Sequence, residues 1–113
     1  MKRKNPPLPR ISKARIEEMI EEATVDANSE SEQITGWFTM IGQNLAVPFE
    51  TTVLGVLVTV KRIDLNPSEQ IVAVCSRGPH RQPLPILDLP LPAPAPAGWE
   101  WIEAYRHWRG SWQ

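Results

Sequence analysis

Length, composition and charge are those of a small globular domain. The chain has 113 residues, of which 42% are hydrophobic and 22% charged, with a net charge of −1. These values predict one domain with a modest core and exclude disorder over most of the chain. No run of 18 apolar residues occurs and the single cysteine, Cys75, cannot form an internal disulfide, so we expect a cytoplasmic protein with no membrane partner.

Charge separates the first part of the chain into two blocks. Residues 1–15 contain six lysines and arginines and no acid, whereas seven carboxylates and no basic residue occur between Glu17 and Glu32. We expect residues 1–11 to be a flexible basic arm and residues 12–113 a single α+β domain. The arm could bind an anionic surface, but it has prolines and no aromatic side chain that would stack on bases, so a solvated tail is the preferred interpretation and nucleic acid is not an expected partner.

Residues 12–45 carry apolar side chains at helical spacing and predict two helices. Ser12 is the expected N-cap of the first helix, at about residues 13–26, and Ser29 with Glu32 has the spacing of a capping box for the second. Acidic residues occupy the opposite side of the first helix. The predicted buried positions of the two helices are Ile16, Met19, Ile20, Ala23 and Ala27, and then Ile34, Trp37, Phe38, Ile41 and Leu45.

The pattern changes to that of strands over residues 47–91. Short β-branched runs at 49–53, 56–63, 71–75 and 84–91, with turns at 66–68 and 77–81, predict a small antiparallel SH3-like barrel or curled sheet. Prolines in the last run place it at an edge. Residues 92–98 form a Pro-rich strap, and residues 99–110 predict a helix that packs a face of aromatic side chains against the sheet, namely Trp101, Tyr105, Trp108 and Trp112.

Oxygen-bearing side chains gather where the two first helices meet. They occur at every second position in Asp26, Asn28, Glu30 and Glu32, with Glu22 and Glu21 as supporting ligands one turn back. Calcium takes six to eight oxygen ligands in such a loop, and the acids near the end of the first helix lie where its dipole disfavours them. The pattern is not that of an EF-hand, because Ser31 and Trp37 stand where its glycine and bidentate acid belong. The alternative is a solvated acidic face, with Glu30 and Glu32 capping the second helix.

Four stretches together resemble the cyanobacterial calcium-binding protein (CcbP-type) family and its bacterial relatives. They read IEEMIEEATVDANSESEQITGWFTMIGQNLAVPFETTVLG, IVAVCSRG, ILDLPLP and WEWIEAYRHW, and the resemblance covers residues 15–108. It implies a small α+β protein that binds calcium through surface carboxylates, as a buffer or sensor. Relatives often carry acids where this chain has Gly42-Gln43, Lys61 and Asn66-Pro67-Ser68, so a weakened calcium site is expected.

The remaining features favour binding over catalysis. We do not expect an enzyme, because the chain lacks a phosphate loop, a dinucleotide fingerprint and a nucleophile elbow. Cys75 lies in an apolar strand and is expected in the core, and His80 and His107 lack metal-ligand spacing. The alternative function is a barrel-based interaction module that holds a protein or nucleic acid through the basic arm, the Arg77–Arg81 turn or exposed tryptophans.

Overall fold

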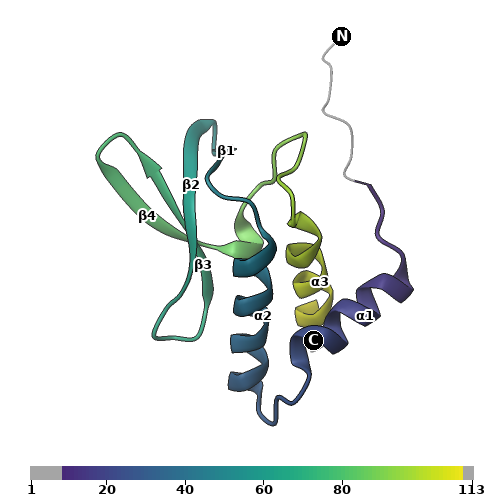
Figure 1. Cartoon of the computed structure of the whole chain (residues 1–113). Coiled ribbons are helices and arrows are strands. Elements are labelled where there is room, and N and C mark those ends of the chain that lie inside the picture. Colours follow the sequence, from purple (N-terminus) through teal and green to yellow (C-terminus); the bar gives the residue numbers. More distant parts are fainter. Residues whose placement is uncertain (1–8, 111–113) are drawn as a thin grey trace.

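The computed structural model describes residues 9–110 and has helices at both ends of an antiparallel sheet (Figure 1). This confirms the α+β class. The elements in chain order are α1 (Lys13–Thr24), α2 (Glu30–Asn44), β1 (Phe49–Val53), β2 (Val56–Leu65), β3 (Ile71–Arg77), β4 (His80–Pro85), the 3-10 helix η1 (Ile86–Asp88) and α3 (Trp99–Gly110). Most of the predicted basic arm and Trp112 lie outside the described residues. Within residues 9–110, no helix combines the length and apolarity needed to cross a bilayer.

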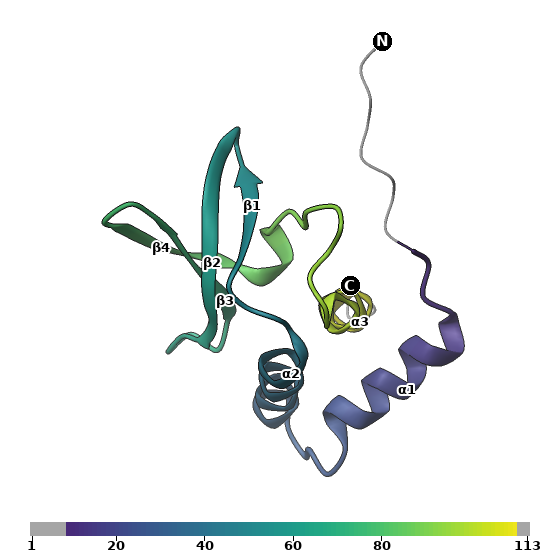
Figure 2. The ribbon, with the colours of Figure 1, turned by 45° about the horizontal axis from the view of Figure 1, so that its top comes forward.

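Each strand pairs with the next one along the chain. The order β1-β2-β3-β4 is antiparallel throughout, with a bulge in β2 between Val60 and Arg62. In the described part of the chain no pairing joins β1 to β4, so the sheet is open and corresponds to the curled-sheet prediction, without barrel closure. The sheet is strongly twisted: in Figure 2, β4 runs across the direction of β1 and β2.

The prediction of a fourth strand at 84–91 is wrong, and the turn predicted at 77–81 is present but shorter. β4 spans His80–Pro85, and only Gly78 and Pro79 separate it from β3. A tight connection is feasible because Gly78 has a φ of +57°, which costs glycine little. The strand ends at Pro85, and the chain then turns into η1, which places Ile86 and then Leu89 in the core.

Aromatic side chains form the centre of the helical side. Trp37 of α2 is 0% exposed, and its ring lies 5.5–6.3 Å from the rings of Trp101, Tyr105 and Trp108 on α3. The aromatic face of α3 therefore packs mainly against α2, not against the sheet as predicted. α2 also contacts β2, and Figure 1 shows it between α3 and the sheet.

Two glycines permit close backbone contacts between elements. A Cβ atom on Gly36 of α2 would collide with the carbonyl oxygen of Ala23, at the end of α1. Gly98, at φ +88°, lies equally close to the carbonyl oxygen of Asn44. Beside it, the N–H of Ala46 donates to the carbonyl of Ala97 at 2.8 Å. The Pro-rich strap at 92–98 is thereby attached to the end of α2.

Candidate functional site

The junction between α1 and α2 forms the predicted capping arrangement. The Glu32 N–H donates to Ser29 Oγ at 3.2 Å, and Glu32 Oε1 accepts from the N–H of Asn28 at 2.6 Å. The carboxylate of Glu32 thus reaches back across the helix start, as in a capping box, although it meets the N–H of Asn28 and not that of the N-cap residue. Asp26 turns the chain with a φ of +62°. The prediction that Glu32 caps the second helix is therefore confirmed.

The other predicted calcium ligands are distributed over the same surface. Glu30 Oε2 lies 3.7 Å from Arg109 Nη1 of α3, and both side chains are about half exposed. Glu21, Glu22 and Asp26 are exposed, and their side chains make no hydrogen bond or ion pair within residues 9–110. In this described range no three His, Cys, Asp or Glu side chains come close enough to hold a metal ion. The structure thus brings Glu32 onto the Asn28 backbone and Glu30 onto an arginine, and does not bring three of the carboxylates together.

Glu69 is an acidic residue at this junction that sequence reasoning missed. It lies in the β2–β3 turn, at a φ of +61°, and its Oε2 accepts a hydrogen bond from Ser31 Oγ at 2.6 Å. The turn is held by Asn66, whose Oδ1 accepts from the N–H groups of Ser68 and Gln70. Ser31 and Glu69 are 38 residues apart, so no local sequence pattern predicts this hydrogen bond. It adds a carboxylate from the sheet to the first turn of α2.

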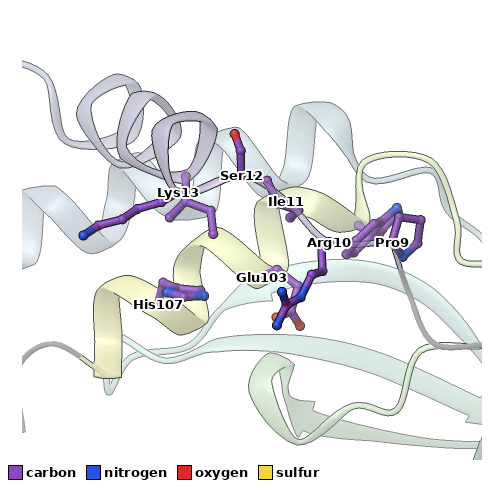
Figure 3. Close-up of a pocket in the computed structure, with 9 residues that line it drawn as sticks. Pro9, Arg10, Ile11, Ser12, Lys13, Glu103 and His107 are labelled. Atoms are coloured by element: carbon purple, nitrogen blue, oxygen red, sulfur yellow. The ribbon is translucent and has the colours of Figure 1, made fainter.

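A wide groove lies between the start of α1 and α3. It encloses about 920 Å³ and is lined by the segment from Pro9 to Lys13 on one side and by α3, including Glu103 and His107, on the other (Figure 3). Its polar groups already have structural tasks. Ser12 Oγ caps α1 by accepting from the N–H of Arg15, and Glu103 lies 3.3 Å from Arg106. The groove has mixed charge and no set of side chains that points to one chemistry.

A second groove lies on the sheet, between the two hairpin tips. We call it the sheet groove; it encloses about 400 Å³ and is lined by Val53, Leu54, Val56, Val58, Cys75, Ser76, Arg77, His80, Arg81, Gln82 and Leu84. Side chains on a strand alternate between faces, so Val56, Val58 and Val60 share one face of β2. Val60 is 0% exposed, whereas Val56 is 39% exposed. The same face of β2 is therefore buried at Val60 and partly exposed to solvent at Val56.

The two arginines of the sheet groove have no counter-charge within the described residues. Arg77, His80 and Arg81 lie at its rim, and no Asp or Glu lines it. Arg77 and Arg81 form no ion pair within residues 9–110. By contrast, four other arginines in this range approach a carboxylate at 3.3–3.9 Å, namely Arg15, Arg62, Arg106 and Arg109. The groove thus combines an aliphatic floor with an uncompensated positive rim.

Leu54 is the most exposed large apolar side chain at this end of the sheet. It is 98% exposed and lies with Gly55 in the β1–β2 turn, where their φ values are +50° and +78°. Two-residue hairpin turns of this kind favour Asn-Gly, because a leucine at positive φ is strained. The signal that could have identified Leu54 is a large apolar residue in the position that a turn reserves for asparagine.

Cys75 lies in the floor of the sheet groove and belongs to the core, as predicted. Its side chain is buried, and its Sγ lies 3.7 Å from the carbonyl oxygen of Ala73. Burial raises the pKa of the thiol above the ordinary value of 9.0. The thiol is therefore neutral near pH 7, which does not favour a nucleophilic role.

Comparisons of the chain with protein-family models, curated proteins and solved structures gave no match. The calcium-binding function implied by the resemblance therefore stays a prediction, and a functional proposal depends on the two surfaces described above. These are the acidic junction of α1 and α2 and the sheet groove.

Proposed function

We propose that this chain is a protein-interaction domain that binds an extended segment of another protein in the sheet groove. The observation that carries the proposal is the unequal burial of one sheet face, from Val60, which is 0% exposed, to Val56, which is 39% exposed. Apolar side chains that α2 leaves uncovered are available to a partner. The sheet groove, at about 400 Å³, is in the size range of protein ligand sites, which is roughly 300–1,000 Å³.

Two exposed apolar side chains line this surface. Among the described residues, five large hydrophobic side chains are exposed, and two of them, Leu54 and Val56, line the sheet groove. Burying a valine or leucine side chain fully contributes about 1.5–3 kcal/mol. Leu54 is 98% exposed and can contribute most of this range on binding, whereas Val56 is 39% exposed and can contribute part of it. The adjacent edge strand β4 contains Pro83 and Pro85, which cannot donate to an added strand, so binding through the groove is favoured over strand addition along β4.

The test is selection from a phage-displayed library of seven-residue peptides, followed by fluorescence polarisation with the selected peptides. Val56→Lys places a charge in the groove, whereas Leu57→Lys places the same charge on the next residue of the strand, which faces the other side. We expect Val56→Lys to weaken binding by about tenfold or more, as loss of one anchor requires, and Leu57→Lys to leave it unchanged. Equal loss in both variants, or no enriched peptide, contradicts the proposal.

A second candidate function is weak calcium binding at the acidic junction, in the buffer or sensor role that the resemblance implies. One observation supports it specifically: Glu69 is hydrogen-bonded to Ser31 and so brings one more carboxylate to the junction. Glu21, Glu22 and Asp26 add three carboxylates that have no partner within residues 9–110. Within residues 9–110, the only arginine or lysine in an ion pair with an acid of α2 is Arg109, with Glu30. A divalent cation would reduce the repulsion among these groups. The ligand set proposed remains Asp26, Asn28, Glu30, Glu32, Glu22 and Glu21.

Calorimetric titration with calcium, paired with thermal shift against a chelator, tests this candidate. A variant with Asp26→Asn, Glu30→Gln and Glu32→Gln should lose the heat and the shift. The control variant, Glu17→Gln with Glu18→Gln, removes charge from the same helix outside the ligand set and should retain both. No heat and no shift at millimolar calcium would end this candidate, and it would leave the sheet groove unaffected.

A further inference from the structure

We infer that the segment bound in the sheet groove carries a carboxylate two residues from an aliphatic side chain. This inference rests on the proposed function and specifies the partner chemistry at the same surface. Three observations support it. The groove lining changes from aliphatic to basic across the strands, the arginines of the groove have no carboxylate partner within residues 9–110, and the spacing of strands in a sheet is known.

The groove changes from apolar to cationic from one hairpin to the other. Val53 on β1 is directly opposite Val56 on β2, next to the first hairpin turn. Arg77 on β3 is directly opposite His80 on β4, next to the second turn. Figure 1 shows both turns at the same end of the sheet, away from the helices. A ligand that spans the groove therefore meets aliphatic side chains at one side and arginine side chains at the other.

The arginines of the sheet groove have no anionic partner among the described residues, so we expect the bound segment to supply one. Arg77 and Arg81 have no carboxylate partner within residues 9–110, whereas four of the other five arginines in this range have one. Arginine binds carboxylates through charge-assisted hydrogen bonds that are stronger than neutral ones. A partner carboxylate at the rim would supply this charge beside an apolar surface from which water is excluded on binding.

Strand geometry sets the spacing between the two groups on the partner. Adjacent strands lie about 4.8 Å apart, so β2 is roughly 5 Å from β3 and 10 Å from β4. Side chains at positions i and i+2 of an extended segment lie on one face and are about 6.5–7 Å apart. An aliphatic side chain at i over Val56 and Val58 thus brings a carboxylate at i+2 within reach of the long side chain of Arg77.

The lining favours a polypeptide over a nucleic acid. Nonspecific binding of single strands uses aromatic side chains on which bases stack, and the groove residues include no Phe, Tyr or Trp. The described tryptophans cannot supply this function, because Trp37, Trp99, Trp101 and Trp108 are buried. The apolar floor instead fits the aliphatic half of the proposed segment.

The test uses the peptides selected from the seven-residue library on the wild-type chain. We expect enrichment of a Val, Ile or Leu at i with Asp or Glu at i+2. Replacing that acid by its amide in a synthetic peptide should weaken binding by about tenfold or more, the equivalent of one charge-assisted bond. Combined Arg77→Gln and Arg81→Gln substitutions should produce a similar loss for the acidic peptide and little change for the amide peptide.

Arg62→Gln is the matched control, because Arg62 lies on β2 outside the groove and should leave both affinities unchanged. Peptides that bind at Val56 without an acid preference would overturn this inference and leave the proposed function standing. Failure to enrich any peptide would overturn both. Binding of a 20-nucleotide single-stranded DNA that is lost in the double arginine variant, with steep salt dependence, would also overturn the inference in favour of a nucleic-acid partner.

Discussion

One face of β2 is buried at one end and exposed to solvent at the other, and this comparison shows that the length of α2 limits how much of the strand is covered. Val60, near the middle of the strand, is fully buried, whereas Val56, on the same face, is 39% exposed. α2, the helix against β2, has 15 residues and β2 has 10. At 1.5 Å per helical residue and about 3.3 Å per strand residue, the helix is roughly 22 Å long and the strand roughly 33 Å long. A helix of this length cannot cover the whole strand, and the uncovered end forms the sheet groove.

The largest expected effect comes from the centre of the covered side. Trp37→Ala removes the ring that contacts three aromatic side chains of α3, and we expect a loss of about 3–5 kcal/mol in the free energy of unfolding. Val56→Ala, at the open end, should change it by less than about 1 kcal/mol, because the side chain is partly solvated already. Urea unfolding measures both. Equal losses would mean that the two ends are not different in packing.

The next effect separates two glycines of α2. Gly36→Ala forces a Cβ atom onto the Ala23 carbonyl, whereas a Cβ atom on Gly42 meets nothing within 4 Å. We expect Gly36→Ala to lower the free energy of unfolding by about 1–3 kcal/mol through overpacking. Gly42→Ala should raise it by up to about 1 kcal/mol through helix propensity. Opposite signs in urea unfolding support the close contact of α1 and α2, and two gains would contradict it.

A smaller effect is expected at the open end, where Leu54 has a positive φ. Leu54→Asn places a residue that tolerates this conformation, and it should stabilise the fold by about 0.5–1 kcal/mol. The same change should weaken binding of the selected peptides, because it removes an apolar anchor. Paired thermal unfolding and polarisation measurements test both parts. A variant that is less stable, or that binds as well as the wild type, would contradict the role given to Leu54.

The smallest effect concerns pH. Burial raises the pKa of Cys75 above 9.0, so the unfolded chain loses this proton at a lower pH than the folded chain. The free energy of unfolding is therefore unaffected by this group below about pH 9 and falls as pH rises through the folded pKa. Cys75→Val should make the fall above about pH 9 smaller. Burial also raises the pKa of Tyr105 above 10.0, which gives a loss of the same sign at higher pH that the variant retains.

Local patterns in the sequence predict the helices and their starts well. Ser12 and Ser29 both cap their helices as expected, because capping depends on residues within one turn. The predicted fourth strand begins four residues too late and continues past Pro85, where β4 ends, because the turn before it consists of Gly78 and Pro79 alone. The aromatic face of α3 was recognised, but its partner Trp37 was not, because periodicity indicates a buried face without indicating what covers it.

The candidate sites were less predictable for the same reason. The Glu30–Arg109 pair and the Ser31–Glu69 hydrogen bond join residues far apart in the chain, so no spacing rule foretells them. The sheet groove depends on how far α2 reaches along β2, which the tertiary packing decides. Leu54 was visible as a local anomaly, a leucine in a turn that prefers asparagine, but its meaning came only from its position beside the uncovered valines.

The central claim is that the open end of the sheet is the binding surface. The most direct measurement is a two-dimensional NMR titration of the 15N-labelled full chain with a library-selected peptide. The account predicts that amide shifts concentrate at Val56, Val58, Arg77 and His80, while Trp99 and His107 of the other groove stay unchanged. Shifts concentrated at the groove between α1 and α3, or at the acidic junction, would contradict it.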